Sequence, residues 1–188
     1  MMWESVAVFC GSRTGHNKLF IQHAKETGLF IAARKIKMIY GGGKNGLMGI
    51  VADTVLRNNG TVVGVIPQML NEKEHQHETL TALHIVEDMH SRKKLMYELS
   101  DAAIILPGGY GTMDELFEMI TWNQLNIHDK KIVLLNSGGY YDHLIAHIDR
   151  MQQEDFLYND SLKSLVIVPD PQAFASLMDE DTHQNHHE

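Results

Sequence analysis

Short apolar runs alternate with longer amphipathic segments along most of this chain, and no other feature of the sequence restricts its fold as strongly. Apolar runs predict strands at Val6–Cys10, Met38–Tyr40, Thr61–Ile66, Leu83–Val86, Ala102–Leu106, Ile132–Leu135 and Val166–Val168. Helical periodicity predicts helices at Asn17–Ala33, Gly46–Asn58, Ser91–Leu99, Thr112–Asn126 and Tyr140–Gln152, with a short helix from Pro171. Such alternation indicates βαβ units with right-handed crossovers. We therefore predict a Rossmann-like α/β fold: a doubly wound, mostly parallel sheet with helices on both faces.

The length and charge of the chain restrict its organisation and its partners. The 188 residues suit one domain over 1–180, and the polar, His-rich residues 181–188 are expected to be disordered. A formal net charge of −8 argues against a nucleic acid polymer or an anionic membrane as partner. No apolar stretch approaches the roughly 20 residues that span a bilayer. The single cysteine, Cys10, and the lack of a signal peptide pattern predict a cytoplasmic protein.

Three predicted strands end in glycine-rich turns, at 10–12, 40–43 and 106–109. In a parallel sheet such turns meet at the carboxyl edge, where ligands bind. Glycine allows close backbone approach, and the following helices present free N–H groups, so the edge suits an anion such as a phosphate. Ser12 and Gly43 are candidates for contact with this ligand. A strand-to-helix turn also uses glycine for structural reasons alone, but three such turns at one edge favour a ligand.

Several common sites are absent from the sequence. Residues 41–46 match the G-x-G-x-x-G pattern, yet the end of the next strand, at 64–67, has no acidic residue to bind a ribose of NAD. No Walker lysine motif and no Gly-x-Ser-x-Gly elbow occurs. The histidines form no convincing ligand set, so we expect most of them on the surface and no metal. No organic cofactor is expected.

The segment 106–115 is the richest in candidate residues. Its glycines and Thr112 are suited to wrapping a phosphate with backbone amides and a hydroxyl. Thr112 and Glu115 also match a capping box, which requires no function. Glu115 is expected one helical turn in, close to the anion site, where the helix dipole should keep it ionised. An ionised carboxylate there would stabilise an oxocarbenium-like centre or orient water.

A second cluster, Arg92-Lys93-Lys94, lies at the predicted start of a helix. Cations are unfavourable at a helix N-terminus, and an anionic partner would offset that cost. Arg92 has the geometry to bind a phosphate or carboxylate through two N–H groups. A solvated basic patch is the alternative, and it is the interpretation we adopt for Lys94.

Taken together, these motifs resemble the Lonely Guy family of cytokinin-activating phosphoribohydrolases, whose bacterial members carried the older label of lysine decarboxylases. The resemblance covers roughly residues 6–168. The segments that match are Phe9–Ser12, Tyr40–Gly43, Gly46–Gly49, Met89-His90-x-Arg92-Lys93, Pro107–Thr112 with Glu115, Trp122-x-Gln124-Leu125 and Ile127-His128. Asn126 and Lys131 depart from the family pattern, where glycine and proline are common. Both departures lie after the candidate catalytic helix and concern local loop geometry.

The resemblance implies hydrolysis of an N⁶-substituted adenosine 5′-monophosphate to free base and ribose 5-phosphate, without a cofactor. It implies that Arg92 and Glu115 are the catalytic pair and that the protein is a homodimer with its active site near the interface. The residues expected to bind substrate are Ser12, Gly43, Glu74, Lys93, Gly108, Gly109, Tyr110, Gly111, Thr112, Met113, Asp114 and Thr121.

Other functions stay open at this point. A broader purine nucleotide nucleosidase acting on AMP fits the same motifs, and a carrier on the same fold would need the phosphate loops but not the Arg92 and Glu115 pair. Lysine decarboxylation is poorly supported because no constellation for pyridoxal phosphate is evident.

Overall fold

A computed structural model of the chain describes residues 3–71, 77, 79–158 and 163–176, and in them seven strands form one sheet. The strands are β1 (Ser5–Phe9), β2 (Lys37–Tyr40), β3 (Val62–Pro67), β4 (Ala82–Val86), β5 (Ala102–Ile105), β6 (Ile132–Leu135) and β7 (Leu165–Val168). Their order is β4-β3-β2-β1-β5-β6-β7, and every neighbouring pair is parallel. The predicted fold class is confirmed, and each predicted strand lies within one residue of an observed one.

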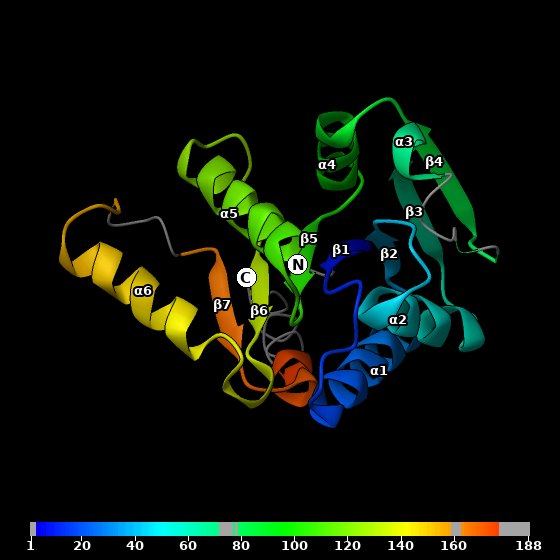
Figure 1. Ribbon diagram of the computed structural model, residues 1–188, viewed down its shortest axis with the longest axis horizontal. Coiled ribbons are helices and arrows are strands. Elements are labelled where there is room, and N and C mark those ends of the chain that lie inside the picture. Colours follow the sequence, from blue (N-terminus) through cyan, green and yellow to red (C-terminus); the bar gives the residue numbers. More distant parts are fainter. Residues whose placement is uncertain (1–2, 72–76, 78, 159–162, 177–188) are drawn as a thin grey trace, which may run out of the picture.

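Helices cover both faces of this sheet (Figure 1). They are α1 (Lys18–Ala33), α2 (Gly46–Arg57), α3 (Gln68–Asn71), α4 (Met89–Glu98), α5 (Tyr110–Gln124) and α6 (Asp142–Gln153), with a 3-10 turn η1 at Ser137–Gly139 and helical residues at 171–176. Helices α1 and α2 pack on one face, and α4 and α5 pack on the other. Right-handed crossovers explain this, because the chain leaves β1 and β5 in opposite directions along the sheet.

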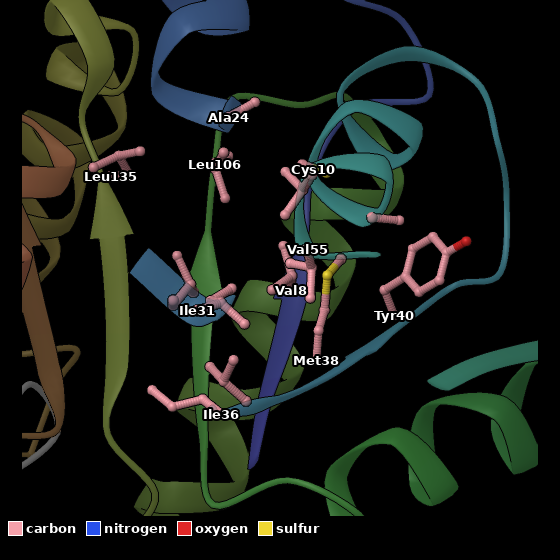
Figure 2. Close-up of a cluster of buried hydrophobic side chains, with 14 of the residues drawn as sticks. Val8, Cys10, Ala24, Ile31, Ile36, Met38, Tyr40, Val55, Leu106 and Leu135 are labelled. Carbon is pink, nitrogen blue, oxygen red and sulfur yellow. The ribbon is translucent and has the colours of Figure 1, made fainter. Parts of the chain in front are cut away.

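Two hydrophobic clusters hold the layers together, one on each face of the sheet. Figure 2 shows the first, in which side chains of β1, β2 and β5 lie against Ala24 and Ile31 of α1 and Val55 of α2. Successive strand residues alternate between the clusters, so Val8 belongs to the first and Phe9 to the second. The central strands are buried on both faces, which is why they read as continuous apolar runs.

Three helix starts differ from the predictions by two residues: α4 begins at Met89 and not at Ser91, and α5 and α6 differ as well. Helix α5 begins at Tyr110, two residues before the predicted start, and it is followed by Asn126 at φ 54°. Asparagine tolerates this left-handed conformation, so Asn126 takes the role that glycine commonly has there. Helix α6 begins at Asp142, not Tyr140, because Gly138 and Gly139 have positive φ angles and interrupt the helix. The predicted tail, 181–188, lies outside the described residues.

The order of the strands positions the site. From β1 the chain moves outward through β2, β3 and β4, and then returns to β5, which pairs with the other side of β1. The crevice between the carboxyl ends of β1 and β5 is therefore the switch point of the sheet, where open α/β folds bind ligands. In the described part of the chain, no helix is long and apolar enough to cross a membrane.

Candidate active site

The glycine-rich turns after β1 and β5 touch each other at the switch point. The N–H of Gly11 donates to the carbonyl of Pro107 at 3.0 Å, and a Cβ on Gly11 would lie 3.4 Å from the Cα of Gly108. The start of α2 joins them: the N–H of Leu47 donates to the carbonyl of Gly11 at 3.0 Å, and Gly46, at φ 62°, lies against the backbone of Ser12. The parallel pairing of β1 with β2 and β5 places the 40–43 turn at the same edge, so the prediction that the three turns gather there is confirmed.

A cavity of about 230 Å³ opens at this edge. Its lining residues come from the β1 turn, α2, α4 and the start of α5, and they are Cys10, Gly11, Ser12, Met48, Arg92, Gly109, Tyr110, Gly111, Thr112 and Glu115. A second cavity of about 260 Å³ shares Gly11, Ser12 and Gly109 with it and extends toward Phe20 and Tyr140. The first cavity therefore combines a helix N-terminus, a guanidinium and a carboxyl.

Helix α5 presents its N-terminus to the cavity. Gly109 is its N-cap, so the first helical N–H groups, which have no partner within a helix, belong to residues that line the cavity. Cβ atoms on Gly109 and Gly111 would meet nothing within 4 Å, whereas one on Gly108 would lie 2.1 Å from the Thr112 hydroxyl. The capping-box interpretation was wrong, because Thr112 lies inside the helix and not at its cap. The open space over Gly109 and Gly111 is suited to an anion.

Arg92 lies on α4 and is buried with 8% of its surface exposed. Its Nε donates to the carbonyl of Val65 at 3.1 Å, and its Nη2 donates to the carbonyl of Gly41 at 3.2 Å. Its Nη1 lies 3.8 Å from the sulfur of Met89. The carbonyls of Val65 and Gly41 fix the plane of the guanidinium, and Arg92 lines the cavity.

Glu115 is partly buried in the second turn of α5, on the same cavity as Arg92. Burial raises the pKa of Glu115 from 4.5 to about 7; Arg92 and Lys93 oppose this, while Asp114 and Glu118 add to it. The expectation that the helix dipole keeps this carboxyl ionised was wrong. Glu115 is the sixth residue of α5, beyond the first turn in which the dipole acts, and loss of solvent is the larger effect.

Lys93 is paired inside the protein. Its Nζ lies 3.1 Å from Oδ2 of Asp114 and 3.0 Å from Oε2 of Glu118, and Tyr97 also donates to Glu118 at 3.0 Å. Neither Lys93 nor Asp114 lines the cavity. The negative charges that compensate the charge of Lys93 therefore come from within the protein. The start of α4 also has its own anion: its N-cap, Asp88, accepts from the N–H of Ser91 at 2.8 Å.

The other predicted site residues are distributed unevenly. Ser12, Gly109, Tyr110, Gly111 and Thr112 line the cavity. Gly43 is buried, Met113 packs against the core on the α5 face, and Thr121 is exposed and donates to the carbonyl of Phe117 at 2.7 Å. Glu74 lies outside the described residues.

Two tyrosines that sequence reasoning missed hold the β5 turn in place. Tyr140 donates to the carbonyl of Gly108 at 2.6 Å, and Tyr141 donates to the carbonyl of Leu106 at 2.7 Å. They are more than 30 residues away in sequence, so no local pattern signals the contact.

Cys10 also lines the cavity, and burial and the nearby Glu115 raise the pKa of its thiol, so it is protonated at neutral pH and not nucleophilic.

Two histidines are exceptions to the predicted surface location. His23 is buried on α1, with Nδ1 2.8 Å from the hydroxyl of Ser137, and His77 is buried with Nε2 2.9 Å from Asp53. Both join elements that are distant in the sequence, which periodicity does not reveal. Among the residues that the structure describes, no group of three His, Cys, Asp or Glu side chains is placed to hold a metal ion.

A parallel sheet with a helix N-terminus open to a cavity at its switch point defines a Rossmann-type α/β protein with a candidate anion site. Residues 48–178 match the family described as "Possible lysine decarboxylase". A probable cytokinin riboside 5′-monophosphate phosphoribohydrolase of Oryza sativa subsp. japonica is 48% identical over 164 residues, which cover 87% of this chain and 74% of that protein. The cytokinin riboside 5′-monophosphate phosphoribohydrolase of Rhodococcoides fascians is 46% identical over 88% of this chain and 83% of its own length. The chain belongs to this family, the Lonely Guy family of phosphoribohydrolases.

Solved structures agree on the fold. The molybdenum cofactor binding protein from Rippkaea orientalis aligns with a TM-score of 0.71 at 19% identity, over 97% of this chain and 99% of that one. The Moco carrier protein from Chlamydomonas reinhardtii aligns with a TM-score of 0.71 at 15% identity, over 96% and 98%. At these identities the likeness shows the fold alone.

Proposed function

We propose that this protein hydrolyses the N-glycosidic bond of cytokinin riboside 5′-monophosphates, which are N⁶-substituted adenosine nucleotides, to free base and ribose 5-phosphate. One observation carries this proposal: Arg92, Glu115 and the N-terminus of α5 line one cavity. The function agrees with relatives of that name that are 41–48% identical to this chain.

The phosphate would bind at the start of α5. Backbone N–H groups of Gly109, Tyr110, Gly111 and Thr112 are the donors, and the helix dipole favours the negative charge. This local attraction opposes the net charge of −8, which would otherwise repel an anionic substrate. Ser12, which also lines the cavity, adds a hydroxyl. With the phosphate fixed, the rest of the nucleotide extends along the cavity toward Glu115 and Arg92.

Glu115 is suited to the centre that becomes positive. As the bond between C1′ and the base nitrogen breaks, its electron pair leaves with the base, and an ionised carboxylate stabilises the charge that develops at C1′. The oxygen of water then bonds to C1′, and one water proton passes to the carboxylate. A pKa near 7 suits such proton exchange at neutral pH.

Arg92 would orient the substrate and stabilise the departing base. Its pKa makes it a poor proton donor, so the proton that the base nitrogen gains comes from the water and carboxyl system. The reaction is balanced: one water is consumed, its OH remains on the ribose and its proton on the base. Lys93 does not line the cavity and would act indirectly, through its ion pairs with Asp114 and Glu118 on α5.

The test is product analysis with the Glu115→Gln variant as control. The protein is incubated with isopentenyl-AMP, AMP and lysine, and the products are separated by chromatography. We expect free base and ribose 5-phosphate from the nucleotides, no product from lysine, and a loss of at least about 100-fold in turnover for Glu115→Gln. Near wild-type turnover in that variant would contradict the role of Glu115. Tight binding of intact nucleotide without base release would indicate a carrier, and faster cleavage of AMP would indicate a broader nucleosidase.

We also infer that the protein is a homodimer. Residues Tyr110, Phe117 and Leu125 of α5 and its C-cap follow the 3.6-residue period, and their side chains are 98%, 36% and 64% exposed. This stripe, which also includes the exposed Asp114 and Thr121, runs from the rim of the cavity along α5. A second copy of the same surface would cover it and bring the interface next to the active site.

A further inference from the structure

Gly41 lies at the end of β2, where the guanidinium of Arg92 fills the space that a side chain would occupy. A Cβ on Gly41 would lie 1.8 Å from Nη2 of Arg92 and 3.0 Å from its Cζ. Gly41 is not among the residues with positive φ, so its backbone conformation is open to any L-residue. Glycine is therefore required here because the side chain of Arg92 occupies the space that a Cβ would need, and not because of the backbone conformation.

The neighbouring residues Gly42 and Gly46 also make contacts within the protein. Gly42 has φ 80° and accepts from the N–H of His77 at 3.3 Å, while Gly46 has φ 62° and lies against Ser12. Neither Gly41 nor Gly42 lines the cavity. The 41–46 segment, which matches a phosphate-binding pattern in sequence, instead supports the side chains and turns around the cavity.

Arg92 meets this segment through directed hydrogen bonds. The carbonyl of Gly41 accepts from Nη2, and the carbonyl of Val65, in the adjacent strand β3, accepts from Nε. Two carbonyls on neighbouring strands hold one edge of the planar guanidinium, so its other N–H groups have a defined direction. The close approach that makes this possible depends on the missing Cβ.

We propose that Gly41 is a positioning residue for the hydrolysis, because its carbonyl and its missing Cβ seat Arg92 against the end of β2. The proposal rests on the function proposed above, since it assigns a use to the position of Arg92. A methyl group at residue 41 would displace the guanidinium by more than 1 Å without changing the phosphate site. A displacement of that size at a catalytic group costs on the order of 100-fold in rate.

The experiment is a double-mutant cycle of Gly41→Ala and Arg92→Ala, with isopentenyl-AMP as substrate. We expect Gly41→Ala to lower kcat about 10- to 100-fold while KM changes much less. In the Arg92→Ala background the added methyl meets no guanidinium, so it should change kcat less than about threefold. An equal loss in both backgrounds, or wild-type kcat in Gly41→Ala, would overturn the proposal.

Gly28→Ala is the matched control for a general loss of stability. Gly28 is buried in α1, and its Cβ would lie 2.7 Å from the Cβ of Thr54, remote from the cavity. This variant should unfold at a lower temperature yet keep the wild-type kcat and KM of the folded protein. If kcat falls as far as in Gly41→Ala, the effect is not specific to Arg92.

Thermal unfolding separates failure of this proposal from failure of the proposed function. Gly41→Ala should lower Tm when Arg92 is present and have little effect in the Arg92→Ala protein, where the clash is relieved. If Arg92→Ala keeps wild-type turnover, the catalytic role of Arg92 fails, and the same Tm comparison still decides whether Gly41 seats it. If Gly41→Ala does not fold, recovery of folding in the double variant supports the proposal that Gly41 positions Arg92. A double variant that also fails to fold contradicts that proposal.

Discussion

At the scale of single residues, Glu115 is subject to opposing electrostatic influences. Its partial burial favours the neutral acid, and Arg92 on the same cavity favours the carboxylate. Burial is the stronger of the two, so the pKa of Glu115 rises from 4.5 to about 7. The folded protein therefore contains a carboxyl that is only partly ionised at neutral pH, which is useful for proton exchange but costs stability.

We predict that Glu115→Gln stabilises the protein at alkaline pH. Because the folded-state pKa is raised, the folded wild type binds a proton more tightly than the unfolded chain between about pH 4.5 and 7. Its free energy of unfolding therefore falls as pH rises through this window, whereas glutamine does not titrate. The variant should be more stable by up to about 3 kcal/mol at pH 8 and similar to wild type at pH 4.5. Urea unfolding at both pH values measures this, and a constant difference would contradict it.

At the scale of elements, α5 is supported by segments from elsewhere in the chain. Tyr140 and Tyr141, between η1 and α6, donate to carbonyls of the β5 turn, and Thr112 packs under Gly108. The N–H groups of the first turn of α5 consequently face open space within a fixed frame. An anion bound there would need little reorganisation of the protein.

Two glycines at this helix start should separate folding from binding. Gly111→Ala meets open space, so we expect an unchanged or higher Tm, because alanine favours a helix more than glycine does. The methyl group would occupy the phosphate position and weaken AMP binding about 10-fold or more. Calorimetric titration of AMP in the Glu115→Gln background measures the affinity without turnover.

Gly108→Ala is the counterpart of that variant. Its Cβ would lie 2.1 Å from the Thr112 hydroxyl and 2.9 Å from the N atom of Gly11, so we expect a lower Tm from strain in the turn.

For the Gly111→Ala variant, the contrary result is AMP binding as tight as in its parent protein. That result would show that the start of α5 does not hold the phosphate.

At the scale of the whole molecule, the fold and the site contribute different information. Molybdenum cofactor proteins share the fold at 15–19% identity, whereas proteins with the phosphoribohydrolase name are 41–48% identical. The parallel sheet supplies a crevice at its switch point, and the side chains of α4 and α5 decide what that crevice does. The exposed stripe on α5 adds a surface that suits a second copy of the chain.

We predict that Phe117→Glu yields a monomer with reduced turnover. A buried, unpaired carboxylate at the centre of a symmetric interface would disfavour association, because both copies carry it. Light scattering coupled to gel filtration measures the mass. Ile167→Glu is the control, since Ile167 is 43% exposed on the edge strand β7 and is not part of the α5 stripe. A wild-type protein that is monomeric, or a Phe117→Glu variant that still dimerises, would show that the stripe is not the interface.

The sequence by itself determined the strands, most helix bounds and the meeting of three glycine-rich turns at one edge. This succeeded because central parallel strands are buried on both faces and appear as apolar runs such as Ile132–Leu135, which was predicted with its observed limits. The proposed catalytic roles of Arg92 and Glu115 stay predictions from a resemblance in motifs; the structure adds that both residues line one cavity.

Only the tertiary structure decided how those residues are held. The capping box at Thr112 and Glu115 is a local pattern, but the N-cap of α5 is Gly109, next to a turn that packs against the β1 turn. Lys93 is paired with Asp114, 21 residues away, and Arg92 is held by Val65 and Gly41, which lie 27 and 51 residues away. Such contacts depend on the relative placement of helices and strands, and so does the loss of solvent that raises the pKa of Glu115. Local periodicity carries no information about these contacts or about the loss of solvent at Glu115. It shows which face of an element is buried and not what lies opposite that face.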